Sequence, residues 1–82
     1  MSAGDHRVTL VTRAACHLCA DAEVVLRRLA TELRFAYREV DVDASPALRD
    51  EFGDRVPVVL LDGKEHAYWT VDEPRLRRSL LR

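Results

Sequence analysis

The order of apolar and polar residues changes period several times along this chain, and each change predicts a new element. The segment Arg7 to Thr12 is β-branched and aliphatic without helix formers, which predicts a strand buried on both faces. After it, apolar residues recur at spacings of three and four, so we expect a long amphipathic helix that begins at or just after Cys16. The apolar stripe of this helix consists of Leu18, Ala22, Val25, Leu26, Leu29, Ala30 and Leu33.

The middle of the chain returns to strand periodicity and then predicts a short helix. Phe35 to Val42 alternates between apolar and polar residues, which is typical of a second strand. Its inward residues are expected to be Tyr37, Val40 and Val42. Ser45 followed by Pro46 predicts a helix start, because a serine hydroxyl caps free amides and a proline in the first turn loses no hydrogen bond. The apolar face and the end of this helix are assigned to Leu48, Phe52 and Gly53.

The last third of the chain predicts a hairpin and a closing helix. Val56 to Leu61 is a third strand whose proline stands near its start, where a missing N–H does least harm. The turn signal Asp62-Gly63 joins this run to a fourth strand, Glu65 to Val71. The final helix starts at Asp72, Glu73 and Pro74 and is expected to pack through Leu76, Leu80 and Leu81.

This order of elements predicts the fold class. An initial strand-helix-strand unit places the first two strands parallel with a right-handed crossover, and the closing hairpin adds an antiparallel edge. We therefore expect an α/β protein with one four-stranded mixed sheet (β-α-β-α-β-β-α) flanked by helices, which is the arrangement of the thioredoxin fold. The length predicts a single domain over residues 1–82.

Composition and charge exclude several kinds of partner. Apolar residues make up 48% of the chain and charged residues 33%, with a formal net charge of -1, so the sequence carries no electrostatic signature of nucleic-acid binding. No apolar run approaches the roughly 18 residues of a membrane span, and residues 1–7 do not resemble a secretory leader. We expect a cytoplasmic monomer without nucleic-acid or membrane partners.

Both cysteines of the chain lie in the segment AACHLC, residues 14–19. Cys16 stands at the predicted junction of strand and helix, where unpaired backbone amides and the positive helix end favour a thiolate. Cys19 follows three positions later, which returns its sulfur to the same side of the helix. This spacing predicts that Cys16 attacks a disulfide and that Cys19 resolves the mixed disulfide. In a reducing compartment, a disulfide that closes so short a loop is a weak structural staple.

Two other interpretations of the cysteine pair compete with redox chemistry, namely metal ligation and simple core packing. A closed zinc site needs about four ligands, but a second cysteine pair is missing and His6, His17 and His66 show no regular ligand spacing. A C-x-x-C beside a strand-helix-strand pattern favours a redox dithiol. The alternative is a metal or iron–sulfur binding module that uses the same cysteines with ligands from elsewhere.

Three segments resemble the bacterial glutaredoxin-like branch of the thioredoxin superfamily: TRAACHLC at 12–19, VDVD at 40–43 and RVPVV at 55–59. The likeness runs from about Arg7 to Leu80 and implies a thiol–disulfide oxidoreductase that cycles between dithiol and disulfide without a bound cofactor. It also implies that Val56-Pro57 is the cis-proline pair of the family, where the backbone of Val56 pairs with the substrate. Arg13 matches a position that is usually basic, and it is expected to steady the thiolate and attract a carboxylate.

The resemblance is incomplete at two places that bear on the substrate. Typical glutaredoxins have C-P-Y-C at the dithiol, whereas this chain has Cys16-His17-Leu18-Cys19. They also carry a Gly-Gly turn and an acidic signature that hold glutathione, whereas residues 68–73 read YWTVDE. The expected partner is therefore a disulfide-containing protein or glutathione, and either glutathione or a thioredoxin-reductase-type system supplies the electrons.

Four side chains near these motifs carry further expectations. His17, directly beside Cys16, can tune the dithiol, because an imidazolium stabilises the reduced form. Trp69 is either a rim of the substrate groove or a packing residue of the hairpin. We expect His6 and His66 to be surface residues.

Overall fold

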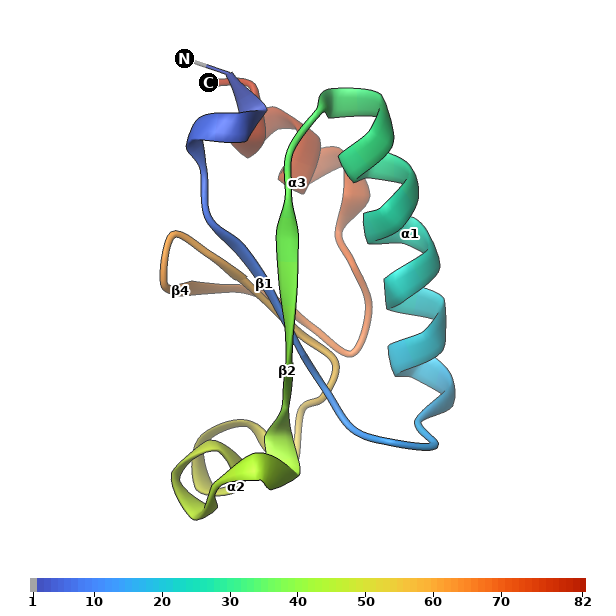
Figure 1. The fold of residues 1–82 in the computed structure, drawn as a ribbon, viewed down its shortest axis with the longest axis vertical. Helices are drawn as coiled ribbons and strands as arrows, with labels where there is room; N and C mark the ends of the chain where they lie inside the picture. The colour runs from blue at the N-terminus through green and yellow to red at the C-terminus, as the bar shows by residue number, and fades with distance from the viewer. Residues whose placement is uncertain (1) are drawn as a thin grey trace.

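The sheet of this protein confirms the predicted mixture of parallel and antiparallel strands. The computed structural model describes residues 2–82, so Met1 of the expected domain lies outside the described residues. The strands follow the order β2-β1-β3-β4 (Figure 1). β1 (Val8–Thr12) is parallel to β2 (Tyr37–Asp41) and antiparallel to β3 (Val58–Leu61), which forms a hairpin with β4 (Lys64–Tyr68). This is the α/β architecture with one four-stranded mixed sheet that the sequence predicted.

Three helices accompany the sheet: α1 (His17–Leu33), α2 (Pro46–Phe52) and α3 (Glu73–Leu80). Figure 1 shows α1 running along the sheet, with α2 and α3 at opposite ends of the molecule. Two short 3-10 turns, η1 (Ala3–Asp5) and η2 (Val42–Ala44), were not expected from the sequence pattern. Of the helices described for residues 2–82, none combines the length and apolar character needed to cross a lipid bilayer.

The helix-start signals act as the sequence predicted. The Ser45 hydroxyl accepts the N–H of Leu48 at 3.1 Å at the start of α2, and Pro46 occupies the first helical position. At the start of α3, the Asp72 carboxylate accepts the N–H of Arg75 at 3.3 Å. These side chains satisfy amides that the first helical turn leaves without intrahelical partners.

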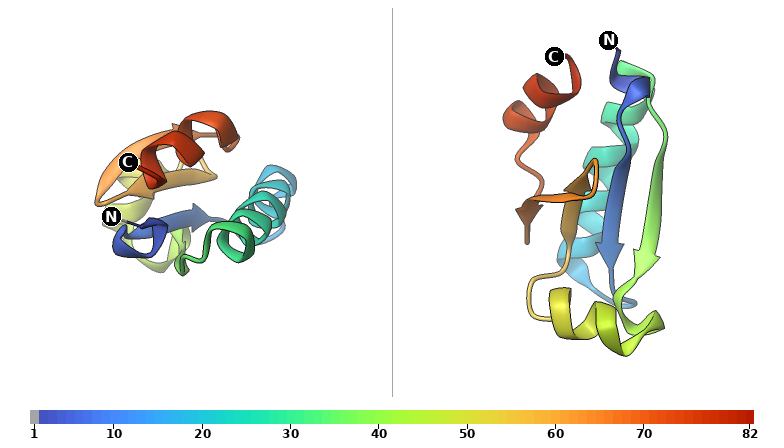
Figure 2. Two further views of the ribbon diagram at one scale, coloured as in Figure 1. Left: turned by 90° about the horizontal axis from the view of Figure 1, so that it is seen from above. Right: turned by 90° about the vertical axis from the view of Figure 1, so that its left-hand side faces the viewer.

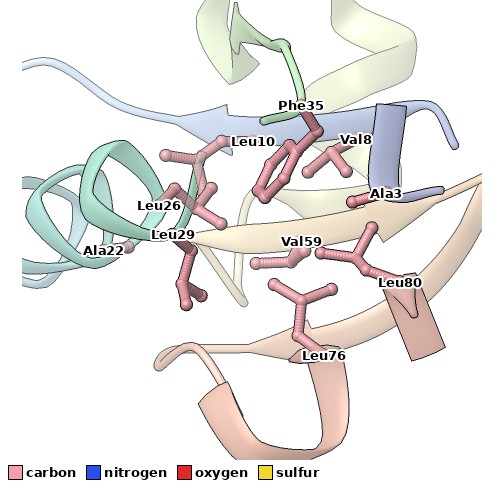
Figure 3. Packing of buried hydrophobic residues seen from close by; sticks show 10 residues of the cluster. All are labelled: Ala3, Val8, Leu10, Ala22, Leu26, Leu29, Phe35, Val59, Leu76 and Leu80. Carbon is pink, nitrogen blue, oxygen red and sulfur yellow. The ribbon is translucent and has the colours of Figure 1, made fainter. Parts of the chain in front are cut away.

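The core is divided by the sheet into two apolar clusters, because successive residues of β1 point to opposite faces. Val8 and Leu10 belong to the larger cluster, whereas Val11 belongs to the smaller one, which confirms that β1 is buried on both faces. Figure 3 shows side chains from α1 and α3 meeting around Val59 of β3 in the larger cluster. The smaller cluster lies toward α2 and contains Val11, Val42, Phe52 and Val58.

The α1 and α3 helices therefore cover the same face of the sheet. Ion pairs of Arg28 with Glu73 and of Arg77 with Glu32 join the two helices at the surface. Figure 2 shows η1 beside the end of α3, and Ala3 of η1 lies in the same cluster as Leu80.

Two predicted core residues are exposed instead. Leu18, in the first turn of α1, is 44% exposed, and Leu81, the residue after α3, is 55% exposed. The predicted packing of these two side chains was therefore wrong, whereas Leu76 and Leu80 are fully buried as expected.

The regular strands are also shorter than the apolar runs that predicted them. Val42 is buried but lies in η2 and not in β2, and β3 starts only after Pro57 because proline has no N–H for the ladder. β4 ends at Tyr68, because Trp69 has a left-handed backbone with φ of 68°. Such a backbone turns the chain out of the strand direction.

The β3–β4 hairpin turns at Asp62 and Gly63, whose φ angles of 53° and 84° are those of a type I′ turn. The Asp62 carboxylate also accepts the backbone N–H of Arg7 at 2.7 Å and contacts His6 Nδ1 at 2.7 Å. The His6 side chain is only 14% exposed, so its expected place at the surface was wrong.

His66 on β4 also departs from its expected surface position. Both of its ring nitrogens are buried without a hydrogen-bond partner within residues 2–82. Burial, with the nearby positive charge of Arg75 as a smaller cause, lowers the pKa of the His66 imidazole. The ring is thus held as a neutral packing group.

Candidate active site

The loop after β1 places Cys16 at the N-terminus of α1. Ala15 adopts a left-handed backbone with φ of 55°, which is uncommon for a residue other than glycine and redirects the chain at this point. Cys16 is then the N-cap of α1, and its Sγ accepts the N–H of Cys19 at 3.2 Å. A sulfur thus takes the place of the serine or aspartate oxygen that usually caps a helix. The predicted start of the helix at the dithiol is confirmed.

The two cysteines have different surroundings. Both are free thiols; Cys16 is half-buried, whereas Cys19 is only 2% exposed. Burial, and then the hydrogen bond with the Cys16 sulfur, raise the pKa of the Cys19 thiol to about 11, although a backbone hydrogen bond from Arg13 acts in the opposite direction. The outer sulfur is accessible to a disulfide, and the inner thiol keeps its proton at neutral pH.

A pocket of about 480 Å³ opens over this dithiol. It contains four of the residues that the sequence singled out, namely Arg13, Cys16, His17 and Cys19. His17 is exposed at the first position of α1. The pocket also contains Glu23, four residues after Cys19, which the sequence analysis did not identify. The spacing of four from Cys19 was the available signal, because residues so placed are neighbours on a helix surface.

The side chain of Arg13 binds elsewhere than expected. Its Nε donates to the Asp43 carboxylate at 3.2 Å and its Nη1 donates to the carbonyl of Gly53 at 3.2 Å. The guanidinium therefore ties the loop after β1 to η2 and to the end of α2. The Arg13 backbone also donates a hydrogen bond that lowers the pKa of Cys19, and the expected action of the guanidinium on the Cys16 thiolate stays a prediction.

Val56 and Pro57 lie at the end of the sheet from which β1 leads to Cys16. The peptide bond between them is cis, as the resemblance implied. The antiparallel register pairs Val11 with Val58, so the residues just before β3 run beside the end of β1. Pro57 is buried, and its carbonyl accepts the N–H of Trp69 at 2.7 Å. Neither residue lines the pocket that contains the cysteines.

The backbone of Val56 differs from that of its neighbours in its hydrogen bonding. None of the loop and turn hydrogen bonds between backbone groups of residues 2–82 involves Val56, whereas the carbonyls of Arg55 and Pro57 both accept the N–H of Trp69. Because Val56 also lies outside β3, its N–H and C=O have no backbone partner within residues 2–82.

Exposed apolar side chains lie next to the dithiol turn. Leu18 and Trp69 line a cavity of about 220 Å³ between α1 and the segment after β4. The Trp69 side chain is 52% exposed and meets the Tyr68 ring edge-on, with 5.0 Å between ring centroids. Trp69 is therefore not a buried packing residue of the hairpin, and its place on a substrate groove stays a prediction.

Metal ligands do not gather around the cysteines. Across residues 2–82, no group of three or more histidine, cysteine, aspartate or glutamate side chains is placed to hold a metal ion.

Comparison with solved structures places this arrangement among thioredoxin-like proteins. Protein Ne2328 from Nitrosomonas europaea superimposes with a TM-score of 0.80 at 25% identity, covering 94% of this chain and 92% of its own. Target protein XcR50 from X. campestris gives a TM-score of 0.72 at 36% identity, with coverage of 89% and 93%. A thioredoxin from Halobacterium salinarum gives 0.63 at 28% identity, with coverage of 96% and 74%.

Sequence comparison agrees with the structural matches. The uncharacterized protein Rv0508 of Mycobacterium tuberculosis is 51% identical over 81 residues, which covers 93% of this chain and 84% of that protein. The profile of the glutaredoxin-like domain (DUF836) matches residues 7–81. This range includes the dithiol, the cis-proline pair and all three helices. On this evidence the chain belongs to the glutaredoxin-like domain (DUF836) family.

Proposed function

We propose that this protein is a thiol–disulfide oxidoreductase in which Cys16 attacks and Cys19 resolves. The observation that carries the proposal is the asymmetry of the dithiol. The Cys16 sulfur caps α1 and accepts an N–H at 3.2 Å, whereas Cys19 is buried and its pKa is raised to about 11. The family and the fold are those of thiol redox proteins, which agrees with this chemistry.

The reaction follows from the positions of the two sulfurs. The Cys16 thiolate attacks one sulfur of a substrate disulfide, and a new S–S bond forms while the other substrate sulfur leaves as a thiolate. Cys19 then loses its proton and attacks the Cys16 sulfur, which releases the second substrate thiolate. The substrate gains two electrons and the protein is left with a Cys16–Cys19 disulfide. Two glutathione thiols, or the dithiol of a thioredoxin-reductase-type system, return the two electrons.

The substrate class is a disulfide-bearing protein or a glutathione mixed disulfide. The open N–H and C=O of Val56 can pair with the main chain of an extended substrate segment beside the dithiol. The exposed side chains of Leu18 and Trp69 supply apolar surface next to the same turn of α1. The cycle needs no bound cofactor, and one copy of the chain contains both sulfurs.

A paired assay tests this function. Reduction of a glutathione mixed disulfide and reduction of insulin are measured for the unmodified protein, Cys16→Ser and Cys19→Ser, with circular dichroism as the control for folding. Cys16→Ser should abolish both activities, because it removes the attacking sulfur. Activity that survives in Cys16→Ser would contradict the assignment.

The Cys19→Ser variant distinguishes the two substrate classes. If this variant still reduces the glutathione mixed disulfide, the protein uses a monothiol route with glutathione, whereas loss of both activities indicates a dithiol protein reductase. Metal in stoichiometric amount in the freshly purified protein, together with no activity in either assay, would overturn the proposal in favour of a metal-binding module.

A further inference from the structure

In the proposed function, on which the following inference rests, the resolving step requires a proton transfer. Cys19 must lose a proton before its sulfur can attack Cys16, because the thiolate is the nucleophile. With a pKa of about 11, only about one Cys19 in 10⁴ is ionised at pH 7. A nearby base that accepts the proton during the attack would remove this limit.

Glu23 is the carboxylate placed to accept that proton. It lies four residues after Cys19 on α1, so the two side chains are neighbours on one face of the helix, and both line the pocket over the dithiol. The charge of Glu23 also raises the pKa of Cys19, after the larger effects of burial and of the Cys16 sulfur. His17 also lines the pocket, but residues two apart on a helix do not face each other.

Glu39 on β2 neighbours Glu23 and is exposed to solvent. Its register partner in β1 is Leu10, which belongs to the cluster facing α1, so Glu39 projects toward α1 as well. The neighbouring Glu23 carboxyl, followed by burial, raises the pKa of Glu39, whereas the charge of Arg27 opposes the rise. Glu23 is half-buried and Glu39 is exposed, so the pair leads from the dithiol pocket to the surface.

We propose that Glu23 accepts the proton of Cys19 during resolution, directly or through one water molecule, and that Glu39 passes protons between Glu23 and solvent. In this step the S–H bond of Cys19 breaks and an O–H bond forms on Glu23. The Cys19 sulfur bonds to the Cys16 sulfur, and the substrate leaves as a thiolate. The proton then moves through Glu39 to water or to the departing thiolate, which restores the Glu23 carboxylate. Glu39 acts only through Glu23 and is a positioning residue.

The two chemical steps can be timed separately with dithiobis(nitrobenzoate), a chromogenic disulfide, mixed in stopped flow with excess reduced protein. Attack by Cys16 releases the first coloured thiolate, and resolution by Cys19 releases the second. The variants are Glu23→Gln and Glu39→Gln. Glu51→Gln is the matched control, because Glu51 lies exposed on α2 and takes no part in the proposed chemistry.

Glu23→Gln should leave the first phase unchanged and slow the second about 100-fold at pH 7. Its second phase should then rise with pH toward the pKa of Cys19, whereas the second phase of the unmodified protein should depend less on pH. Glu39→Gln should slow the second phase less, and Glu51→Gln should change neither phase.

Two results would overturn the inference and are distinguishable from each other. If both phases are present and Glu23→Gln has the rate and pH profile of the control, Glu23 is not the proton acceptor, but the proposed function stands. If the unmodified protein shows no first phase faster than a simple thiol, the proposed function fails and this inference fails with it.

Discussion

His17 shows how one residue can tune a site without entering the core. It lies directly after Cys16 at the first position of α1, lines the dithiol pocket and is exposed to solvent. A positive ring beside the Cys16 thiolate stabilises the reduced protein, because the disulfide form carries no charge there.

The His17→Ala variant should therefore make the Cys16–Cys19 disulfide harder to reduce. We expect the midpoint potential to become about 10–20 mV more negative, a small change because the position is exposed to solvent. Equilibration against a glutathione redox buffer at slightly acidic pH, with the dithiol fraction read by thiol labelling, measures the shift. A midpoint potential equal to that of the unmodified protein would show that His17 does not tune the dithiol.

At the scale of elements, α1 and α3 are joined by a small network of ion pairs. The Arg28 guanidinium, through its hydrogen bond to Glu73, holds the pKa of that carboxyl below its usual value. Arg77 lowers the pKa of Glu32 in the same way. A carboxyl with a lowered folded-state pKa stabilises the fold above its unfolded pKa of about 4.5, and this contribution disappears as the pH falls through the folded pKa.

The Glu73→Gln variant should accordingly lose more stability at pH 7 than at pH 3. The loss should be small and should shrink further in high salt, because these side chains are exposed. Thermal unfolding at both pH values, beside Glu51→Gln as the control for removing one exposed carboxylate, provides the measurement. Equal losses at pH 7 and pH 3 would show that the ion pairs do not stabilise the contact of α1 with α3.

At the scale of the whole molecule, stability depends on a core that joins segments from both ends and the middle of the chain. The larger cluster combines residues of η1, β1, α1, β3 and α3 with Phe35 (Figure 3). The adjacent residues Leu80 and Leu81 offer a matched comparison for this core. Leu80 is fully buried, whereas Leu81 is mostly exposed.

Leu80→Ala should lower the free energy of unfolding by about 2–5 kcal/mol, because it removes buried apolar contacts and leaves a cavity. Leu81→Ala should change it by no more than about 0.5 kcal/mol. Urea denaturation at neutral pH measures both. Similar losses in the two variants would contradict the arrangement of α3 on the sheet.

The order of the helices and strands, the helix starts and the hairpin turn could be predicted from the amino-acid sequence, because these features depend on local chemistry. Capping by Ser45, the left-handed backbone at Asp62-Gly63 and the period of α1 each involve only a few neighbouring residues. The same holds for the placement of Cys16 at the start of α1, since strand and helix meet within this short segment.

The tertiary structure decided which side chains meet across the fold. The partners of Arg13 are Asp43 and Gly53, 30 and 40 residues away, so no local pattern could reveal them. Glu39 reaches Glu23 only because β2 pairs beside β1 under α1. Exposure of Leu18 likewise depends on where the sheet ends beneath the helix. Local periodicity fixes which face of an element is apolar, but only packing fixes how far that face is covered and which polar groups share a pocket.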